Sequence, residues 1–248
     1  MSRTRDVRAI LVRVGIDQAF GGWNAPIDPR SNEFVFVPIP EDDRTLADPA
    51  LRTRYDDHAD ELALFADAKD ARCALPDRLR GVPTHHDPDF RYLTYGDIAT
   101  NRGREIATLE AGDLLVFYSG LRPVAPCAHR LIYALTGQYE VAEVLRADQV
   151  ESSRLHENAH TRMAHRTNDH LIVRAKPDTS GRFDRAIPVG SFRDRAYRLT
   201  PEVLEAWGGI SARNGYLQRS ARPPRLLDPS RYLEWLGARH PGFRHALP

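Results

Sequence analysis

The fold of this chain is decided by the stretch GDLLVFYSG at residues 112–120. This run of apolar and aromatic residues between two glycines predicts a β-strand. Two further apolar runs follow, RLIYALT at 130–136 and QYEVAEVL at 138–145, with Gly137 between them. The spacing predicts three strands that pair in sequence order as a meander.

Shorter apolar runs on either side extend the predicted sheet. Together with the central region, they predict strands at 7–14, 34–39, 113–119, 130–136, 138–145 and 171–176. Helical spacing is confined to a few segments: one or two surface helices within 48–69, a helical stretch at 148–165, and helices at 200–207 and about 229–236. Thr200 is the predicted N-cap of the helix at 200–207. We therefore predict a single α+β domain over residues 1–248, with a mixed or antiparallel sheet and inserted helices. A split into two lobes near residue 150 is the alternative.

The composition is that of an ordinary globular chain, with 248 residues of which 42% are hydrophobic and 28% charged. No run approaches the roughly 20 consecutive apolar residues that a membrane helix needs, and no small-residue cleavage site follows the basic start. We therefore expect a cytoplasmic protein with no membrane partner. Two cysteines, Cys73 and Cys127, are too few for a disulfide framework or a cysteine-based zinc site.

The net charge of +1 is unevenly distributed along the chain. Residues 1–150 hold 18 basic and 24 acidic side chains, whereas residues 151–248 hold 17 basic and 10 acidic side chains. The second part therefore carries a net charge of +7, which suits an anionic partner such as a nucleic acid or a nucleotide.

A glycine-rich loop follows the first predicted strand and is the first candidate binding site. It contains Arg13, Asp17, Gly21, Gly22 and Asn24. Such a loop can present backbone N–H groups to an anion, although it can equally be a tight turn that needs positive φ at its glycines. It has neither dinucleotide-binding nor P-loop spacing and leads to another strand, which excludes both of those sites.

Two histidine-containing segments are the next candidates. The segment HHDPDF at 85–90 carries imidazoles and carboxylates that could bind a metal or share a proton, or form a solvated turn. The segment HENAH at 156–160 matches the zinc-protease pattern H-E-x-x-H, but its neighbours are polar where a protease helix needs apolar residues. His165 and His170 could complete a transition-metal site with His156 and His160, although surface imidazoles explain the pattern equally well. We assign no metal ligand from the sequence.

The C-terminal region interleaves aromatic residues with arginines. Trp207, Gln218 and Arg219 are the candidates there, because base stacking, base-edge contacts and phosphate contacts need these side-chain types. The alternative is an amphipathic end of the domain.

Several of these motifs together resemble a known family. The series Arg13-x-Gly15-x-Asp17, Gly21-Gly22, Pro26-Ile27, His86-x-Pro88-Asp89-Phe90, GDLLVFY at 112–118 and Asn158-x-His160 is similar to the third family of nucleotide-modification-associated domains. The resemblance implies a prokaryotic or phage protein linked to DNA-base modification, with site residues at Arg13, Asp17, Asp89 and His160. Separately, residues 110–145 resemble the barrel core of PUA-like domains (the EVE and ASCH groups), which bind modified bases or RNA. This second resemblance implies a PUA-like barrel with Tyr118, Ser119 and Arg122 near a ligand pocket.

These features support two functions of different classes. The first is recognition of a nucleotide or a modified nucleobase in DNA or RNA, with Trp23, Tyr118 or Trp207 stacking and Arg13 and Arg122 contacting phosphate or base. The second is an enzyme of nucleobase or nucleotide modification, in which Asp17 or Asp89 acts as base and His160 as acid or base. A metal hydrolase built on His156, Glu157 and His160 is a weaker third. The sequence identifies no cofactor and does not set the oligomeric state.

Overall fold

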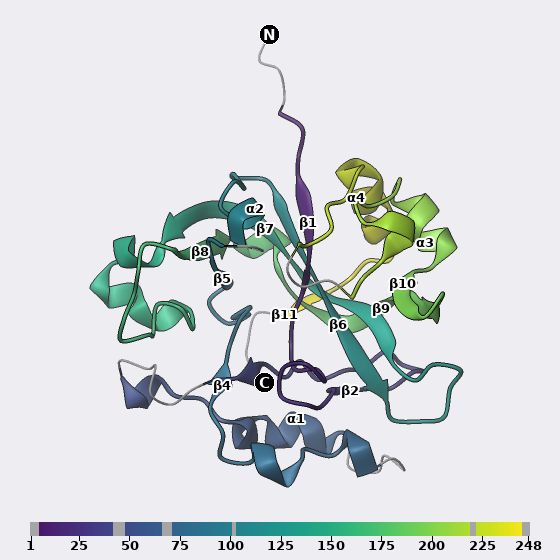
Figure 1. The fold of residues 1–248 in the computed structure, drawn as a ribbon, viewed down its shortest axis with the longest axis horizontal. Coiled ribbons are helices and arrows are strands. Elements are labelled where there is room, and N and C mark those ends of the chain that lie inside the picture. The colour runs from purple at the N-terminus through teal and green to yellow at the C-terminus, as the bar shows by residue number, and fades with distance from the viewer. Residues whose placement is uncertain (1–4, 42–47, 66–70, 101–102, 219–221, 245–248) are drawn as a thin grey trace.

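The computed structural model describes residues 5–41, 48–65, 71–100, 103–218 and 222–244. Its centre is a mixed sheet of nine strands, in which the path β1-β6-β7-β8-β5 is extended by β2 beside β6 and by β9 beside β7, with β10 and β11 both paired with β9 (Figure 1). The strands are β1 Ala9–Arg13, β2 Pro26–Ile27, β5 Thr94–Ile98, β6 Leu114–Pro123, β7 Ile132–Arg146, β8 His170–Ala175, β9 Gly181–Arg193, β10 Ala196–Leu199 and β11 Phe243–Arg244. A separate two-stranded sheet pairs β3 Ile39–Pro40 with β4 Thr84–His85.

The helices are few and short. They are α1 Ala59–Ala63, α2 Gly103–Ile106, α3 Pro201–Ala206 and α4 Pro229–Gly237, with 3-10 turns at Pro49–Leu51, Tyr55–His58, Ala71–Cys73, Asp77–Leu79, Ala147–Gln149, Ser152–Glu157, Pro177–Thr179 and Arg213–Gly215. Within the described ranges, none of the helices is long and apolar enough to cross a membrane.

The predicted α+β fold with a mixed sheet is confirmed. Strands β1 and β2 run parallel to β6, whereas β6, β7, β8, β5 and β9 pair antiparallel. The sheet contains strands from both sides of residue 150. Its described strands do not close into a barrel, so the PUA-like barrel is not confirmed.

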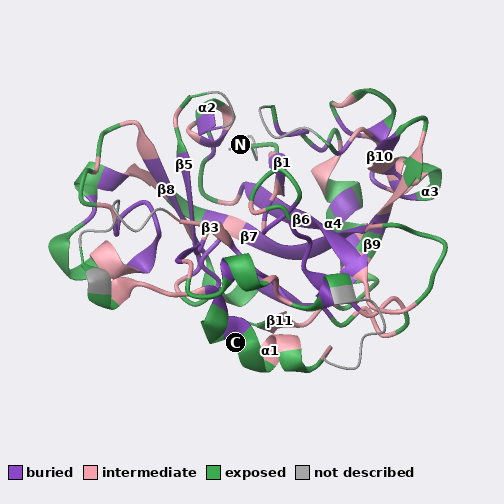
Figure 2. Ribbon diagram, turned by 60° about the horizontal axis from the view of Figure 1, so that its bottom comes forward, coloured by how far each residue is buried: buried purple, intermediate pink, exposed green. Residues whose placement is uncertain are grey.

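Alternate residues of the central strands enter two different cores. Ile10 and Val12 of β1 pack into one core, while Ala9 and Leu11 pack into the other. Helices α3 and α4 cover the second core, on the side opposite β5 and β8 in Figure 1. The central strands are therefore buried on both faces, as Figure 2 shows, which explains why their sequences are continuously apolar.

The predicted meander is wrong, because one strand replaces two. Strand β7 runs without interruption through Gly137, where the sequence predicts a turn. A Cβ at Gly137 would lie 2.7 Å from the carbonyl oxygen of Gly181 in β9, so glycine is required by close approach of the two backbones. The register shifts at this point, and the strand continues through a bulge.

The predicted strand at 34–39 is also wrong for most of its length. Phe34 makes an isolated bridge to Ile27, and only Ile39 belongs to a strand. The segment is nevertheless buried, from Phe34 to Val37. Pro38 and Pro40 have no N–H groups, so this apolar segment cannot form a continuous ladder.

The predicted helices agree best where a cap is present. Helices α3 and α4 are confirmed, and the Thr200 side chain accepts the N–H of Val203 as expected of an N-cap. The segment 48–69 forms only 3-10 turns and α1 within its described residues, and 148–165 forms 3-10 turns followed by a loop. The strands β5, β9 and β10 were not predicted.

Candidate functional site

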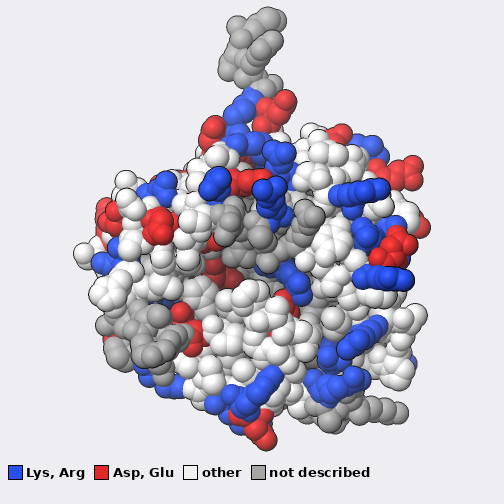
Figure 3. Space-filling model, viewed as in Figure 1, with Lys and Arg blue, Asp and Glu red and all other residues white. Residues whose placement is uncertain are grey.

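A cleft of about 370 Å³ lies where β1 and β4 end, next to β5. The cleft is lined by Arg13, Val14, Gly15, Asp17, Ala19, Phe20, Ile39, His85, Asp87, Tyr95, Asp97, Ile98, His160 and Gln218. In the view of Figure 3, the surface is hollowed near the middle, and acidic and basic side chains lie together inside the hollow. The cleft is of the size that accommodates small ligands, and its lining mixes charged, imidazole and aromatic groups.

Arg13 and Asp17 form one side of the cleft. A guanidinium nitrogen of Arg13 lies 2.8 Å from Oδ2 of Asp17. The other carboxylate oxygen of Asp17 accepts the backbone N–H groups of Ala19 and Phe20, at 2.7 and 2.8 Å. The Arg13 side chain is 19% exposed and the Asp17 side chain 6%, so the pair is fixed by the turn but still reachable from the cleft.

His85, Asp87 and His160 form a second group in the cleft lining. Each offers one ring nitrogen or carboxylate oxygen, and these three atoms lie within 4.8 Å of one another. Nε2 of His160 lies 3.7 Å from Oδ2 of Asp87. The two imidazole rings meet edge to face, with centroids 5.1 Å apart. This carboxylate–imidazole cluster is able to share a proton or to hold a cation.

Neighbouring groups orient both histidines. Nδ1 of His85 lies 2.7 Å from Oε2 of Glu41, and Nδ1 of His160 lies 3.0 Å from Nδ1 of His170. Burial disfavours protonation of His85, but the hydrogen bond and negative charge of Glu41, with the charge of Asp87, outweigh it and raise the pKa of His85.

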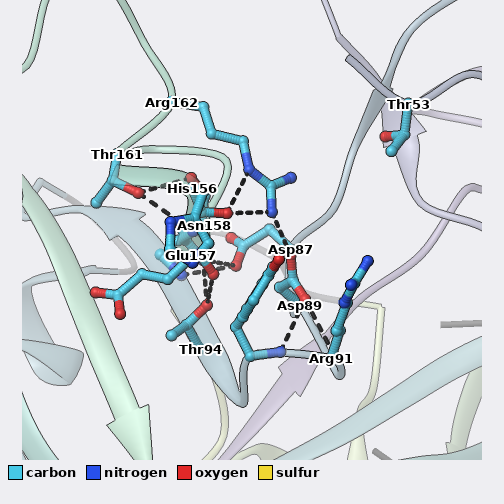
Figure 4. A network of polar contacts seen from close by, with 12 residues as sticks. Thr53, Asp87, Asp89, Arg91, Thr94, His156, Glu157, Asn158, Thr161 and Arg162 are labelled. Atoms are coloured by element: carbon cyan, nitrogen blue, oxygen red, sulfur yellow. Dashed lines mark hydrogen bonds and ion pairs between the residues drawn. The ribbon is translucent and has the colours of Figure 1, made fainter. Parts of the chain in front are cut away.

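Asn158 links the two segments that carry the cluster (Figure 4). Its amide nitrogen lies 3.4 Å from Oδ1 of Asp87 and 3.2 Å from Oγ1 of Thr94. Its side-chain oxygen, Oδ1, accepts the backbone N–H of His160 at 2.9 Å. Asn158 is fully buried, so it acts on the cleft by positioning Asp87 and His160.

Gly96 allows the cluster to form. A Cβ at this position would lie 2.2 Å from Cδ2 of His160 and 2.6 Å from Oδ1 of Asn158. The Gly96 N–H also donates to Oδ1 of Asp87 at 2.6 Å. Strand β5 therefore supports the cluster with its backbone, at the position where a side chain would displace His160.

The cleft also holds an exposed aromatic ring. Phe20 is 52% exposed, which is unusual for a phenylalanine, so part of its side chain is accessible at the cleft. Asp97 also lines the cleft, and its carboxylate accepts the Tyr95 hydroxyl at 2.9 Å and the backbone N–H of Ile98 at 2.8 Å.

The residues predicted from sequence divide between this cleft and the protein interior. Arg13, Asp17, His160 and Gln218 line the cleft. Asp89 does not: it is 0% exposed and forms an ion pair of 2.7 Å with Arg162, visible in Figure 4. It also accepts the N–H groups of Arg91 and Tyr92.

The glycines and the asparagine of the first loop serve the turn. Gly21 and Gly22 have φ values of +95° and +66°, and a Cβ on Gly21 would lie 2.6 Å from the Ile16 side chain. The carbonyl oxygens of both glycines accept hydrogen bonds from Arg78. Asn24 is buried and donates to the carbonyl oxygen of Gly120 at 2.7 Å.

The aromatic residues predicted to stack on a base lie elsewhere. Trp207 is fully buried against Tyr232 and Trp235 in the second core, and Tyr118 is fully buried with its hydroxyl bound to the carbonyl oxygen of Leu217. Protein atoms therefore cover both rings. Trp23 is buried as well, and its indole N–H donates to the carbonyl oxygen of Arg72.

Two other predicted residues are not part of the cleft lining. Arg122 is buried in β6, and Ser119 beside it donates to the carbonyl oxygen of Val14. Arg219 lies outside the residues that the structure describes. The PUA-like resemblance therefore does not locate the cleft.

The H-E-x-x-H pattern does not form a protease site. A 3-10 turn ends at Glu157, and Asn158 is extended, so His156 and His160 are not one helical turn apart. Glu157 is 2% exposed and ion-paired with Arg154 and Arg174, and the His156 ring packs on Tyr92. This geometry disfavours the metal hydrolase.

Sequence reasoning missed several cleft residues. No motif in the sequence marks Phe20 or Asp97, and within 85–90 the sequence predicts Asp89 as the site residue, whereas His85 and Asp87 line the cleft. The sequence does contain one indication of these two residues. In an extended segment successive side chains face opposite sides, so residues 85 and 87 would share one face. No pattern near position 97 marks a site.

Comparison with known proteins agrees with the resemblance found in the sequence. No curated protein and no solved structure matches the chain significantly. The sequence model of nucleotide modification associated domain 3 matches residues 8–222, a span that contains every residue lining the cleft. The chain therefore belongs to the nucleotide modification associated domain 3 family.

Proposed function

We propose that the cleft recognises a nucleobase, free or within a nucleotide or nucleic acid, and that modified bases are among its ligands. One observation carries the proposal: an exposed aromatic ring, Phe20, lies in the same cleft as the Arg13 guanidinium and the Gln218 amide. Oε1 of Gln218 accepts the N–H of Tyr197 at 2.9 Å, and the amide nitrogen of Gln218 carries two N–H groups of the kind that donate to a base edge. Stacking plus edge contacts is how proteins bind unpaired bases.

The charges of the cleft favour a base over a phosphate inside it. Asp17, Asp87 and Asp97 line the cleft, and three carboxylates repel a phosphate group. A carboxylate instead accepts hydrogen bonds from the amino and imino groups of a base edge. Basic side chains gather on the right-hand side of the same face (Figure 3), over chain that Figure 1 colours green to yellow. Phosphates of a bound nucleic acid would contact this basic surface.

Binding measurements test this proposal with a matched pair of variants. Fluorescence anisotropy with single- and double-stranded oligonucleotides, plain and modified, at low and moderate salt, should show affinity that falls with salt. Phe20→Ala should weaken binding about 5- to 150-fold, because stacking on one base contributes roughly 1–3 kcal/mol. Phe192→Ala is the control, since Phe192 is 61% exposed but lies outside the cleft lining. No binding of any oligonucleotide, nucleoside or nucleotide by the wild type would refute the proposal.

A second candidate is an enzyme that modifies the base bound in the same cleft. The cluster of His85, Asp87 and His160 favours it, because recognition alone needs no carboxylate–imidazole pair. Asp17 is a further carboxylate in the lining of the same cleft. Mass spectrometry of nucleosides from cells with and without the gene separates the two functions: an enzyme changes the nucleoside composition and His160→Ala abolishes the change, whereas a binding protein leaves the composition unaltered.

A further inference from the structure

We propose that His85, Asp87 and His160 bind one divalent first-row transition-metal ion, with Zn²⁺, Fe²⁺ and Mn²⁺ as the candidate ions. Two imidazole nitrogens and one carboxylate oxygen are a ligand set that these metals use and that Mg²⁺ and Ca²⁺ do not prefer. The set shares only His160 with the H-E-x-x-H segment. It arises from two parts of the chain that are more than 70 residues apart.

The separations are close to those of a metal site. Two ligand atoms that each lie about 2.1 Å from one ion are about 3–3.5 Å from each other. Nε2 of His160 and Oδ2 of Asp87 are 3.7 Å apart, and the three candidate ligand atoms lie within 4.8 Å of one another. Small side-chain rotations would therefore bring all three atoms to bonding distance without backbone movement.

The outer nitrogen of each imidazole is already engaged, as in known metal sites. Metal-binding histidines usually donate their second ring N–H to a carboxylate or another acceptor, which fixes the ring and raises its basicity. Nδ1 of His85 has Glu41 as this partner, at 2.7 Å, and Nδ1 of His160 has His170, at 3.0 Å. The ligand role therefore falls to Nε2 of both rings.

The carboxylate is oriented in the same manner. Oδ1 of Asp87 accepts the Gly96 N–H at 2.6 Å and lies 3.4 Å from the Asn158 amide, while Oδ2 faces His160. One oxygen is thus held by the backbone of β5, and the other is directed to the cluster. A carboxylate held through one oxygen binds a metal with the other at low entropic cost.

The proposed ion would be accessible from the cleft. All three ligands line the cleft together with Arg13 and Asp17. Three protein ligands leave at least one position of a tetrahedral or octahedral ion for water or for a ligand atom, as in catalytic rather than structural sites. This goes beyond base recognition, because it supplies a Lewis acid next to the bound base.

Metal binding by the chelator-treated full-length protein tests the proposal without any nucleotide. We expect the protein to bind one equivalent of Zn²⁺, measured by isothermal titration calorimetry and by elemental analysis after dialysis. Co²⁺ should compete for the same site and give visible d–d absorption. Zn²⁺ at about 100 times its Kd should raise Tm by about 5 °C. His160→Ala and the nearly isosteric Asp87→Asn should each weaken binding at least about 100-fold, and Glu41→Gln about 10- to 100-fold.

Two histidine variants from the neighbouring segment are the controls. His156→Ala removes a residue of the H-E-x-x-H pattern, and His165→Ala removes an exposed imidazole close in sequence to His160. Both should bind Zn²⁺ as the wild type does. The proposal is overturned if the wild type binds less than a tenth of an equivalent of Zn²⁺, Fe²⁺ and Mn²⁺, or if either control loses as much affinity as Asp87→Asn. Because the assay contains no nucleotide, its failure leaves base recognition standing, and a failure of base recognition leaves the metal site standing.

Discussion

Asp89→Asn is expected to lower the stability of the protein, because Asp89 lies in the interior and does not line the cleft. Asp89 is 0% exposed and pairs with Arg162, whose side chain is 9% exposed, at 2.7 Å. Removing one partner of a buried ion pair costs about 3–5 kcal/mol, because the remaining charge is left unpaired. The side-chain oxygen of the asparagine can still accept the N–H groups of Arg91 and Tyr92, which lie 3.1 Å from the Asp89 oxygen. We therefore expect the free energy of unfolding to fall by about 3 kcal/mol.

This loss is large enough to measure by calorimetry. A chain of this length has an unfolding entropy of about 0.5 kcal/mol/K near 60 °C, so Tm should fall by about 6 °C. The double variant Asp89→Asn with Arg162→Met should lose less than the sum of the single variants. Asp184→Asn is the control, because Asp184 pairs with Arg244 at the surface and should shift Tm by less than about 2 °C. A Tm unchanged in Asp89→Asn together with lost ligand binding would refute this reasoning and assign Asp89 to a binding site.

Three further predictions follow from the described contacts. Arg13→Gln and Asp17→Asn should each reduce the affinity for a base at least about 10-fold while Tm changes by only a few degrees, because this ion pair lines the cleft. A decrease in Tm as large as that of Asp89→Asn would contradict a role of the pair in binding. Burial lowers the pKa of His58 to about 4 and lowers that of His86 well below its usual range, so both rings are neutral in the folded state near neutral pH. The unfolded chain binds these protons more readily, so the free energy of unfolding should fall as the pH drops from about 6.5 towards 4, by about 3 kcal/mol for His58. Chemical denaturation at several pH values checks this, and His58→Phe should flatten the profile. Gly137→Ala should lower Tm by several degrees, since a Cβ there would lie 2.7 Å from the β9 backbone, and an unchanged melting curve would show that the bulge adapts.

The sequence predicts the strands that the core buries on both faces. Strands β1, β6 and β8 are continuous apolar runs, and such runs are informative because few other structures can bury them. Strand β9 is different: it contains charged residues and Pro188, and its pairing with β7 is what makes it a strand. Strand β5, with the sequence TYGDI, is likewise defined by its pairing with β8. Local patterns cannot reveal strands of this kind.

The same limit applies to the candidate site. Arg13 and Asp17 are four residues apart at the end of a predicted strand, so the local sequence already indicates that they lie close together. In the structure the two side chains form an ion pair. His85 and Asp87 meet His160 only because several pairings come together: β4 with β3, and β5 with β8. Those pairings are set by long-range packing, so no spacing in the sequence marks the cluster.

The cluster and the buried ion pair belong to one hydrogen-bonded unit, which affects how variants should be interpreted. Arg162 binds Asp89 and also donates to the carbonyl oxygen of His156, two residues before Asn158. Asn158 in turn contacts Asp87 (Figure 4) and accepts the backbone N–H of His160 with its side-chain oxygen. Disturbing the ion pair therefore displaces the segment that positions the cluster, although Asp89 itself does not reach the cleft. Any loss of ligand or metal affinity in Asp89→Asn should consequently shrink at temperatures well below its Tm, whereas the loss in His160→Ala should persist at every temperature at which the protein is folded.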